Sequence, residues 1–317
     1  MNSHVKMVLP RYPWTKALED GSVSVPGLSW EVVTGIGIAP ERFVATKAED
    51  VDVGENGLRR YVIEFLKGAR PLAIPAFFGR EHMQRNILVR EDSSLTHPRD
   101  LVGKKIGSRL SVFSGTGAAV LMLLEQAYDV PLSDLILCMG DPDHLLNNRM
   151  GLQLGHGPIQ DEEGFHQLLK GEIDALVLTT GSRYFSMFGH DKLDKQVAAH
   201  PGVRVLVNDP STIAETYRRT GLCPISDLVV LGEKAVAADP EVPAKVLAAL
   251  SEANKRSSNY RDEAEEKLAQ DEIALLGTDP HQYELGAEQR KNIAAYTDFF
   301  HRMGAIDRYV EPEELFI

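Results

Sequence analysis

Residues 99–128, with the sequence RDLVGKKIGSRLSVFSGTGAAVLMLLEQAY, carry the pattern that decides the fold. Val102 and Gly103 predict a turn that leads into a short strand over 104–107, and the apolar run 118–128 predicts a helix. A loop of small residues, 111–117, separates the two elements. A strand, a loop rich in glycine and hydroxyl groups, and a helix in this order direct the free N–H groups of the helix toward an anion.

Ser114 and Thr116 are therefore candidate ligand-binding residues in this loop. Their hydroxyl groups can donate to an anion, while Gly115 and Gly117 let the backbone approach it closely. An ordinary strand-to-helix turn, in which Ser and Thr only cap the helix, explains the same residues. The sequence leaves both interpretations open.

The composition is that of a globular protein with an acidic balance. The 317 residues include 46 Asp and Glu against 34 Lys and Arg, for a net charge of −12. This charge argues against nucleic-acid binding, because a phosphate backbone would be repelled. The chain has no apolar run of about 18 residues, so we predict no transmembrane helix. The two cysteines, Cys138 and Cys223, form no disulfide framework or zinc-binding pattern. Residues 1–21 lack a signal-peptide pattern, so we expect a cytoplasmic protein.

Strands and helices alternate on both sides of the deciding stretch. The N-terminal side predicts strands at 5–9, 28–33, 51–53, 72–78 and 86–90, helices at 14–19, 40–47 and 58–67, and a loop at 54–57. The C-terminal side predicts strands at 135–139, 173–178, 203–207 and 228–231, helices at 163–170 and 212–220, and a long surface loop at 140–158. Three helices follow, at 242–256, 262–276 and 287–303. This order indicates wound α/β units.

We therefore predict an α/β fold with two lobes that close like a clamshell, and with helices at the C-terminal end. Lobe one would comprise residues 1–88 and 229–317, and lobe two residues 89–228. The strands at 86–90 and 228–231 would be the crossings between the lobes. A clamshell binds its ligand in the cleft, from which closure removes water.

Several segments resemble the 4,5-dihydroxyphthalate decarboxylase family, in matching order over nearly the whole chain. They are YPWTKALEDGSVSVPGL (12–28), AIPAFFGREHMQRNILVREDS (73–93), RDLVGKKIGS (99–108), KGEIDALVLTT (170–180), TYRRTGLCPISDLVVL (216–231) and AAYTDFFHRMGAIDRYVEPEELF (294–316). The GKKIG segment is common among solute-binding proteins, whereas TYRRTGLCPI and EELF are more specific. The resemblance implies the fold of type-2 periplasmic solute-binding proteins and a cytoplasmic, cofactor-independent decarboxylase.

The chain departs from the family pattern at three places. Met83 and Gln84 stand where the family tends to have an Arg-His pair, and Ser226 and Asp227 stand near a position where it tends to have His. Residues 56–60, NGLRR, replace a serine-rich segment. These places would line a cleft, so the departures put the substrate, and activity itself, in question.

The decarboxylation of a hydroxylated aromatic acid requires cations for the carboxylates, a proton donor for the ring carbon, and a base near the phenol. Arginine matches carboxylates best because its guanidinium is planar and forked. Our candidates for substrate binding are Arg11, Tyr12, Arg80, Arg85, Ser114, Thr116, Thr180, Arg183 and Arg218. Each arginine taken singly is also explained as a solvated surface charge. Arg80 is the preferred anchor, because it follows an apolar run and matches the family motif.

Glu55 and His82 are the candidate catalytic residues. Glu55 lies in a glycine-flanked segment after a strand, and burial would raise the pKa of its carboxyl toward that of a proton donor. A surface turn explains Glu55 equally, and an exposed loop explains His82. No HExxH or similar spacing predicts a metal, although His144 and His156 lie near Asp141 and Asp143 and leave that open.

Three functions compete at this point. The first is a decarboxylase of a phthalate-like aromatic acid, which needs no cofactor. The second is a solute-binding protein or sensor that closes on a small carboxylate without chemistry. The third is another cytoplasmic enzyme on the same scaffold. We favour the first, with a small aromatic carboxylate as partner, no nucleic acid or membrane, and homo-oligomerisation left open.

Overall fold

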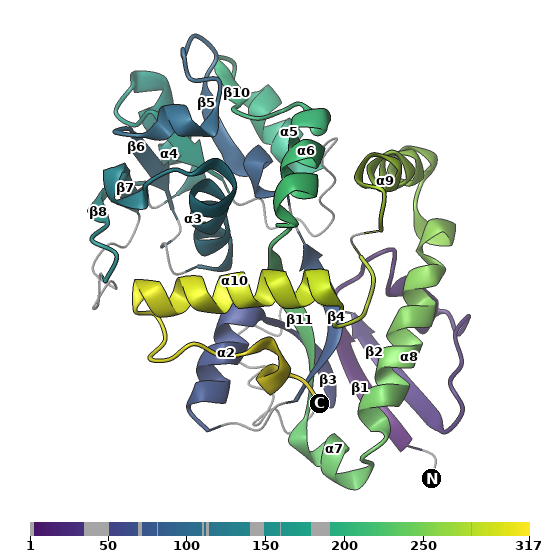
Figure 1. The fold of residues 1–317 in the computed structure, drawn as a ribbon. Helices are drawn as coiled ribbons and strands as arrows, with labels where there is room; N and C mark the ends of the chain where they lie inside the picture. Colours follow the sequence, from purple (N-terminus) through teal and green to yellow (C-terminus); the bar gives the residue numbers. More distant parts are fainter. Residues whose placement is uncertain are drawn as a thin grey trace.

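The computed structural model in Figure 1 describes residues 3–34, 51–68, 72–80, 82–109, 111, 114–139, 149–158, 160–178, 191–279 and 281–317. Two β-sheets, each flanked by helices, organise these residues. The helix predicted at 40–47 lies outside the described residues.

The first sheet joins the N-terminal strands to one strand from much later in the chain. Its order is β2 (Leu28–Thr34), β1 (Ser3–Leu9), β3 (Val53–Gly57), β11 (Ile225–Leu231) and β4 (Ala73–Arg80). Strand β1 is parallel to β2 and β3, and β11 is antiparallel to both β3 and β4. The carboxyl ends of β1 to β4 therefore lie on one edge of the sheet, beside the amino end of β11.

The second sheet is built from the middle of the chain. Its order is β10 (Val203–Val205), β5 (Ile87–Arg90), β9 (Ala175–Val177), β6 (Lys105–Ser108), β7 (Ile136–Met139) and β8 (Gln153–His156). Strands β9, β6, β7 and β8 are parallel, whereas β5 is antiparallel to β9 and β10.

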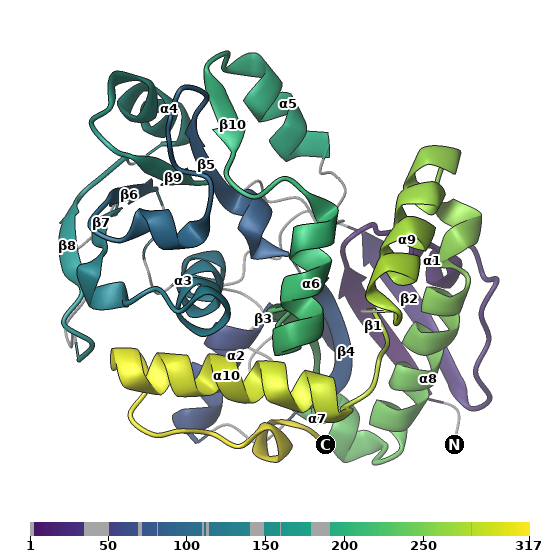
Figure 2. The same cartoon turned by 45° about the horizontal axis from the view of Figure 1, so that its top comes forward.

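Helices cover both sheets (Figure 2). One apolar core takes side chains from both sheets. This core takes side chains from α2 (Leu58–Leu66), α3 (Gly115–Tyr128), α6 (Pro210–Thr220) and α10 (Ala287–Met303). A second core lies between the first sheet and α1 (Lys16–Glu19) with α8 (Val242–Lys255). A third lies between the second sheet and α4 (Asp161–Lys170) with α5 (Asp191–Ala199). Helix α9 (Glu263–Leu276) packs beside α6, and α7 (Glu233–Ala238) beside α8.

The stretch that opened the sequence analysis forms the predicted strand and helix. Strand β6 leads to α3, and the Ser114 side chain caps this helix by accepting a hydrogen bond from the Gly117 amide at 3.0 Å. Helix α3 is buried along most of its length and packs on α10. It therefore lies where elements of both sheets meet.

Two local predictions were wrong. The segment 54–57, predicted as a loop, belongs to β3, because it pairs with residues 227–230 of β11. The predicted surface loop at 140–158 contains β8, which pairs with β7 as a sheet edge. In both cases pairing with another strand overrides local preference.

The predicted crossings were also wrong in detail. Strand β5 lies within the second sheet and β11 within the first, so neither runs between them. The links are the segment between Arg80 and Ile87 and the longer one from Leu206 to Pro224, which includes α6. The limits of the two lobes stay a prediction.

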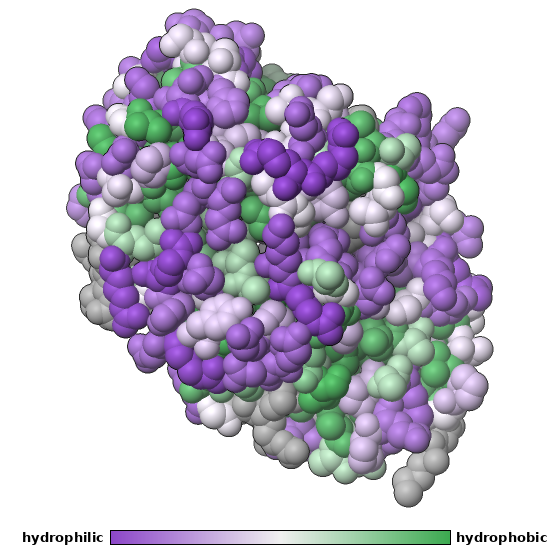
Figure 3. All heavy atoms as spheres, in the orientation of Figure 1, coloured by the Kyte–Doolittle hydropathy of each residue, from purple (hydrophilic) through white to green (hydrophobic). Residues whose placement is uncertain are grey.

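The face of the molecule on which α10 lies is mostly hydrophilic, and hydrophobic side chains gather toward α8 (Figure 3). Within the described part of the chain, every helix is too short or too polar to cross a membrane.

Tyr61 of α2 ties the C-terminal tail to the first sheet. Its hydroxyl accepts hydrogen bonds from the amides of Leu72 (2.8 Å) and Ala73 (3.1 Å) and donates to the carbonyl of Leu315 (2.5 Å). Burial raises the pKa of Tyr61 to about 12, which keeps the hydroxyl protonated and able to donate.

We expect Tyr61→Phe to lower the free energy of unfolding by about 1–3 kcal/mol, because it leaves buried amide and carbonyl groups without their partner. Urea denaturation measures the change. Tyr309→Phe is the matched control in the same tail, since it removes a hydroxyl that binds Glu311 at the surface, and it should change stability by less than about 0.5 kcal/mol. Equal effects of the two variants would contradict the role of Tyr61.

Candidate functional site

The segment that links β4 to β5 brings together three residues that the sequence singled out. Arg80, His82 and Arg85 are all buried, at 2%, 4% and 6% exposure. The 3₁₀ helix η1 (Met83–Asn86) turns the chain between the two sheets. A buried guanidinium requires a counter-ion and a buried imidazole a hydrogen-bond partner, because unpaired charged and polar groups are expensive to remove from water. Each of the three has a carboxylate partner from a different helix.

Arg80, at the end of edge strand β4, forms an ion pair with Glu288 in the first turn of α10. Its side chain is 0% exposed, whereas that of Glu288 is 26% exposed. Burial acts to lower the pKa of Arg80, but Cys223 and Glu288 outweigh it and raise that pKa. The structure therefore commits the guanidinium to a carboxylate of the chain itself.

His82 lies against a second carboxylate. Its Nε2 atom is 3.0 Å from Oε1 of Glu272 on α9, and both residues are buried. The ring of Tyr217 on α6 meets the imidazole edge-to-face, with 6.3 Å between the ring centres. Burial and the Glu288 carboxylate raise the pKa of Tyr217, so its hydroxyl stays protonated. A histidine and a glutamate in this contact can share a proton.

Arg85 points toward the second sheet. It donates to Asp194 of α5 at 2.8 Å and to the side chain of Asn208, which follows β10. The three predicted residues thus lie in one segment, but each contacts a different element.

An aromatic stack connects the loop after β1 to the segment between α9 and α10. Tyr12 stacks on Trp14 with 4.6 Å between ring centres, and Trp14 stacks on His281 at 6.0 Å. The Tyr12 hydroxyl donates to Glu55 of β3 at 3.0 Å. Burial and the Glu55 carboxylate raise the pKa of the nearby Tyr283. Glu55 lies at the Tyr12 end of the stack, because its carboxylate accepts the hydrogen bond from the Tyr12 hydroxyl.

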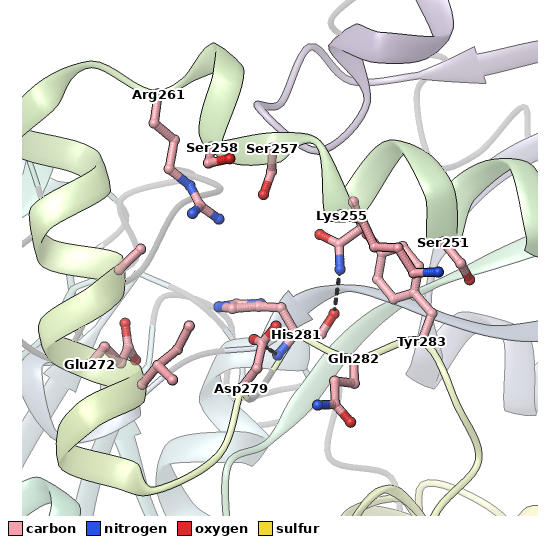
Figure 4. Close-up of a pocket in the computed structure, with 13 residues that line it drawn as sticks. Ser251, Lys255, Ser257, Ser258, Arg261, Glu272, Asp279, His281, Gln282 and Tyr283 are labelled. Atoms are coloured by element: carbon pink, nitrogen blue, oxygen red, sulfur yellow. Dashed lines mark hydrogen bonds between the residues drawn. The ribbon is translucent and has the colours of Figure 1, made fainter. Parts of the chain in front are cut away.

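The other end of the stack reaches a cavity of about 450 Å³. The cavity lies between the end of α8, the 3₁₀ helix η4 (Ser257–Tyr260), α9 and the segment that follows α9. His281, Glu272 and Tyr283 form its inner wall, and Arg261 points into it (Figure 4). Glu272 joins the cavity to His82, and His281 joins it to Trp14.

The remaining predicted residues lie apart from this cavity. Arg11 is 64% exposed and pairs with Glu19, and Arg218 is exposed on α6. Ser114 and Thr116 lie half-buried at the start of α3, where Tyr296 of α10 donates to the Gly115 carbonyl. Thr180 and Arg183 lie outside the described residues, as does His144.

Asp227, one of the departures from the family pattern, lies at the edge of the first sheet where β3 and β4 end. It pairs with Gly57 and Gly79, and its carboxylate accepts a 2.6 Å hydrogen bond from Ser226. Among the residues that the structure describes, no three His, Cys, Asp or Glu side chains gather closely enough to hold a metal ion.

Sequence reasoning did not single out Glu272, Glu288, His281 or Tyr283. They lie in or beside TDPHQYELGAEQ (278–289), a polar and aromatic linker between two predicted helices. Its concentration of titratable groups was the available signal. Its pairing with residues about 200 positions away was not visible.

Arg80→Gln should lower the free energy of unfolding by about 3–5 kcal/mol, because it breaks a buried ion pair and leaves Glu288 without its counter-ion. Arg90→Gln is the control: Arg90 also pairs with a carboxylate, that of Asp92, but the two side chains are 39% and 79% exposed. This variant should lose less than about 1 kcal/mol. Chemical denaturation of both measures the difference, and similar losses would rule out a structural role for the Arg80 pair.

Burial lowers the pKa of His281 below its ordinary 6.5. The carboxylates of Glu272 and Asp279 offset this in part, whereas the nearby cations Arg80 and Arg261 lower the pKa further. When the pKa of a histidine is lower in the folded state, the unfolded chain takes up the proton first as the pH falls through about 6.5. The free energy of unfolding therefore decreases as the pH falls through that value. His281→Gln should therefore lose less stability than the wild type between about pH 7.5 and 5.5.

Thermal denaturation across that range measures the loss. His166→Gln serves as the control, because the His166 side chain is 65% exposed. An unchanged pH dependence in His281→Gln would show that His281 carries no part of it.

Comparison with known proteins supports the fold over the full length. No profile of a known protein family matches the chain. Over 227 residues, 68% of this chain and 81% of the relative, it is 25% identical to 4,5-dihydroxyphthalate decarboxylase of Pseudomonas putida. This identity supports the resemblance inferred from the motifs without establishing membership of that family.

Solved structures of periplasmic binding proteins match the whole chain. The aliphatic sulphonate binding protein SsuA of Escherichia coli matches with a TM-score of 0.58 at 15% identity, over 100% of this chain and 98% of its own. A putative sulfonate-binding SsuA of Methylobacillus flagellatus KT matches with a TM-score of 0.61 at 12% identity, over 99% and 91%. A cysteine-to-serine variant of the desulfurization enzyme DszB, with biphenyl-2-sulfinic acid bound, also matches, with a TM-score of 0.53 at 15% identity, over 98% and 96%. The chain therefore has the predicted α/β, periplasmic-binding-protein-like fold.

Proposed function

We propose that this protein binds a small hydroxylated aromatic carboxylate and decarboxylates it without a cofactor. The observation that carries the proposal is the pair of held carboxylates at the two ends of the aromatic stack. Glu55 binds the Tyr12 hydroxyl at one end, and Glu272 contacts His82 near the other. The 25% identity to 4,5-dihydroxyphthalate decarboxylase supports the same reaction class.

The chemistry accounts for this arrangement. When a ring carboxylate leaves as CO2, the bond electrons stay on the ring carbon, which must receive a proton. A ring hydroxyl para to that carbon supplies electron density, and a base that takes its proton increases the supply. Two proton-transfer groups, one near each end of the stack of Tyr12, Trp14 and His281, meet both needs. Glu55 is the proposed base for the hydroxyl, and His82 with Glu272 the proposed source of the proton.

A second function, ligand binding without chemistry, is favoured by the structural neighbours. The SsuA proteins, which share this fold, are sulfonate-binding proteins. DszB supports an enzyme on the same fold. The two candidates differ in one observable, the release of CO2.

The test is a screen of hydroxylated benzoates and phthalates for CO2 release, with a thermal-shift assay of the same acids and of alkanesulfonates. A decarboxylase should be stabilised by at least one acid and release CO2 from it. Stabilisation by a sulfonate or a carboxylate without any CO2 would favour the binding function.

Glu55→Gln supplies the residue-level prediction. The amide keeps the shape of the side chain but cannot take up a proton, so binding should change less than about threefold while kcat falls by at least about a hundredfold. Glu64→Gln, on α2 and hydrogen-bonded to Lys67 at the surface, is the matched control. Full activity of Glu55→Gln on an acid that the wild type decarboxylates would remove Glu55 from the mechanism.

A further inference from the structure

The cavity beside α9 has the size and the polar character of a site for a one-ring ligand. Its volume of about 450 Å³ falls in the range of small-molecule sites. Two cations, Arg261 and Lys255, and the serines Ser257 and Ser258 line it. Ala269 and Ile273 of α9 add an apolar side. Cations, hydroxyls and an apolar wall together suit a ring that carries carboxylate and hydroxyl groups.

The inner wall of this cavity is also the wall of the proton-transfer cluster. Glu272 faces the cavity and lies 3.0 Å from His82 behind it. His281 faces the cavity and stacks on Trp14, while Tyr283 packs against Phe78 with 5.9 Å between ring centres. A ligand in the cavity would therefore lie directly against the group that the proposed function requires as proton source.

Exposure separates the two arginines that could hold a carboxylate at this end of the site. The Arg80 side chain is 0% exposed and paired with Glu288, so a ligand has no path to it without opening the fold. The Arg261 side chain is 12% exposed, and its guanidinium points into the cavity (Figure 4). It contacts Glu266 at 3.0 Å, and that carboxylate is 27% exposed. The two partner carboxylates are exposed to nearly the same extent, 27% for Glu266 and 26% for Glu288, so the difference lies in access to the guanidinium.

We propose that this cavity is the substrate site, that Arg261 anchors a substrate carboxylate, and that Glu272, positioned by His82, delivers the proton. The inference rests on the proposed function for its chemical step, whereas the binding part stands by itself. It replaces Arg80 with Arg261 as the anchor.

The chemical step balances with one proton. The bond between the ring carbon and the carboxylate breaks, CO2 leaves, and the electron pair stays on the ring carbon. Glu272 in its protonated form transfers its proton to that carbon and becomes a carboxylate. Proton uptake from water through the contact with His82 restores it. Nothing is oxidised or reduced, and one proton is consumed for each CO2 released.

The binding test uses the full chain and 4,5-dihydroxyphthalate, with 4-hydroxybenzoate and phthalate as further probes, in isothermal titration calorimetry. Arg261→Gln should raise the Kd by roughly ten- to a hundredfold, the effect of losing one charge-assisted contact. Lys267→Gln is the matched control, because it removes a cation from α9, the helix that begins two residues after Arg261, at a side chain that is 73% exposed and paired with Asp271. Its Kd should stay within about twofold of the wild type.

Two further variants separate site from fold and binding from chemistry. Ser258→Phe places a ring at the cavity from an exposed position, so it should block binding while the melting temperature stays near that of the wild type. Glu272→Gln keeps the hydrogen-bonding shape toward His82 but has no proton to give. It should leave KM within a few-fold and lower kcat by at least about a hundredfold.

The outcomes distinguish this inference from the proposed function. If Arg261→Gln and Ser258→Phe both leave CO2 release intact, the cavity is not the substrate site, whereas the proposed decarboxylase function stands. Binding that depends on Arg261 and Ser258 without any CO2 release would support the cavity and overturn the chemical step. Full kcat in Glu272→Gln would overturn the proton assignment. A wild type that binds none of the three probes would overturn both the site and the function.

Discussion

Three buried basic side chains in one short link hold three helices of this molecule in place. Between β4 and β5, Arg80, His82 and Arg85 leave water entirely or almost so. A buried charge is tolerated only where an opposite charge or a set of hydrogen bonds meets it. Glu288 of α10, Glu272 of α9 and Asp194 of α5 meet these three residues in turn. The link between the sheets therefore fixes three helices that are far apart in the sequence.

The position of the cavity follows from these contacts. The segment between α9 and α10 has its ends set by Glu272 on one side and Glu288 on the other. Between them, the His281 carbonyl accepts a 2.9 Å hydrogen bond from Asn254 of α8, and the His281 ring stacks on Trp14. A segment held at both ends and in the middle presents its side chains in one arrangement, as a binding site requires.

The sequence predicted what depends on neighbouring residues and missed what depends on distant ones. The turn, strand, hydroxyl loop and helix of 99–128 were visible, because turn residues and apolar periodicity are local signals. Tyr12, Glu55, Arg80 and His82 were selected, and the structure places them around one edge of the first sheet. Their partners were not predictable, since Arg80 and Glu288 are 208 positions apart and His82 and Glu272 are 190 apart. Residues 54–57 fail for the same reason: Gly and Asn favour a turn locally, but β11 supplies the pairing that makes them a strand.

Because the chain is acidic, an arginine at a suitable position is weak evidence for an anion-binding site. With 46 acidic and 34 basic side chains, most arginines can find a carboxylate of their own. Arg11, Arg80 and Arg85, all chosen as anion ligands by their position, are instead paired with Glu19, Glu288 and Asp194. An anionic ligand must therefore replace the carboxylate that an arginine already binds. The positive charge alone does not decide whether that arginine binds the ligand. What decides is whether the ligand can reach the guanidinium and whether the displaced carboxylate can return to water. Arg261, with its guanidinium toward a cavity and a partner that is 27% exposed, meets both conditions, whereas Arg80 fails the first, because its side chain is 0% exposed although its partner Glu288 is 26% exposed.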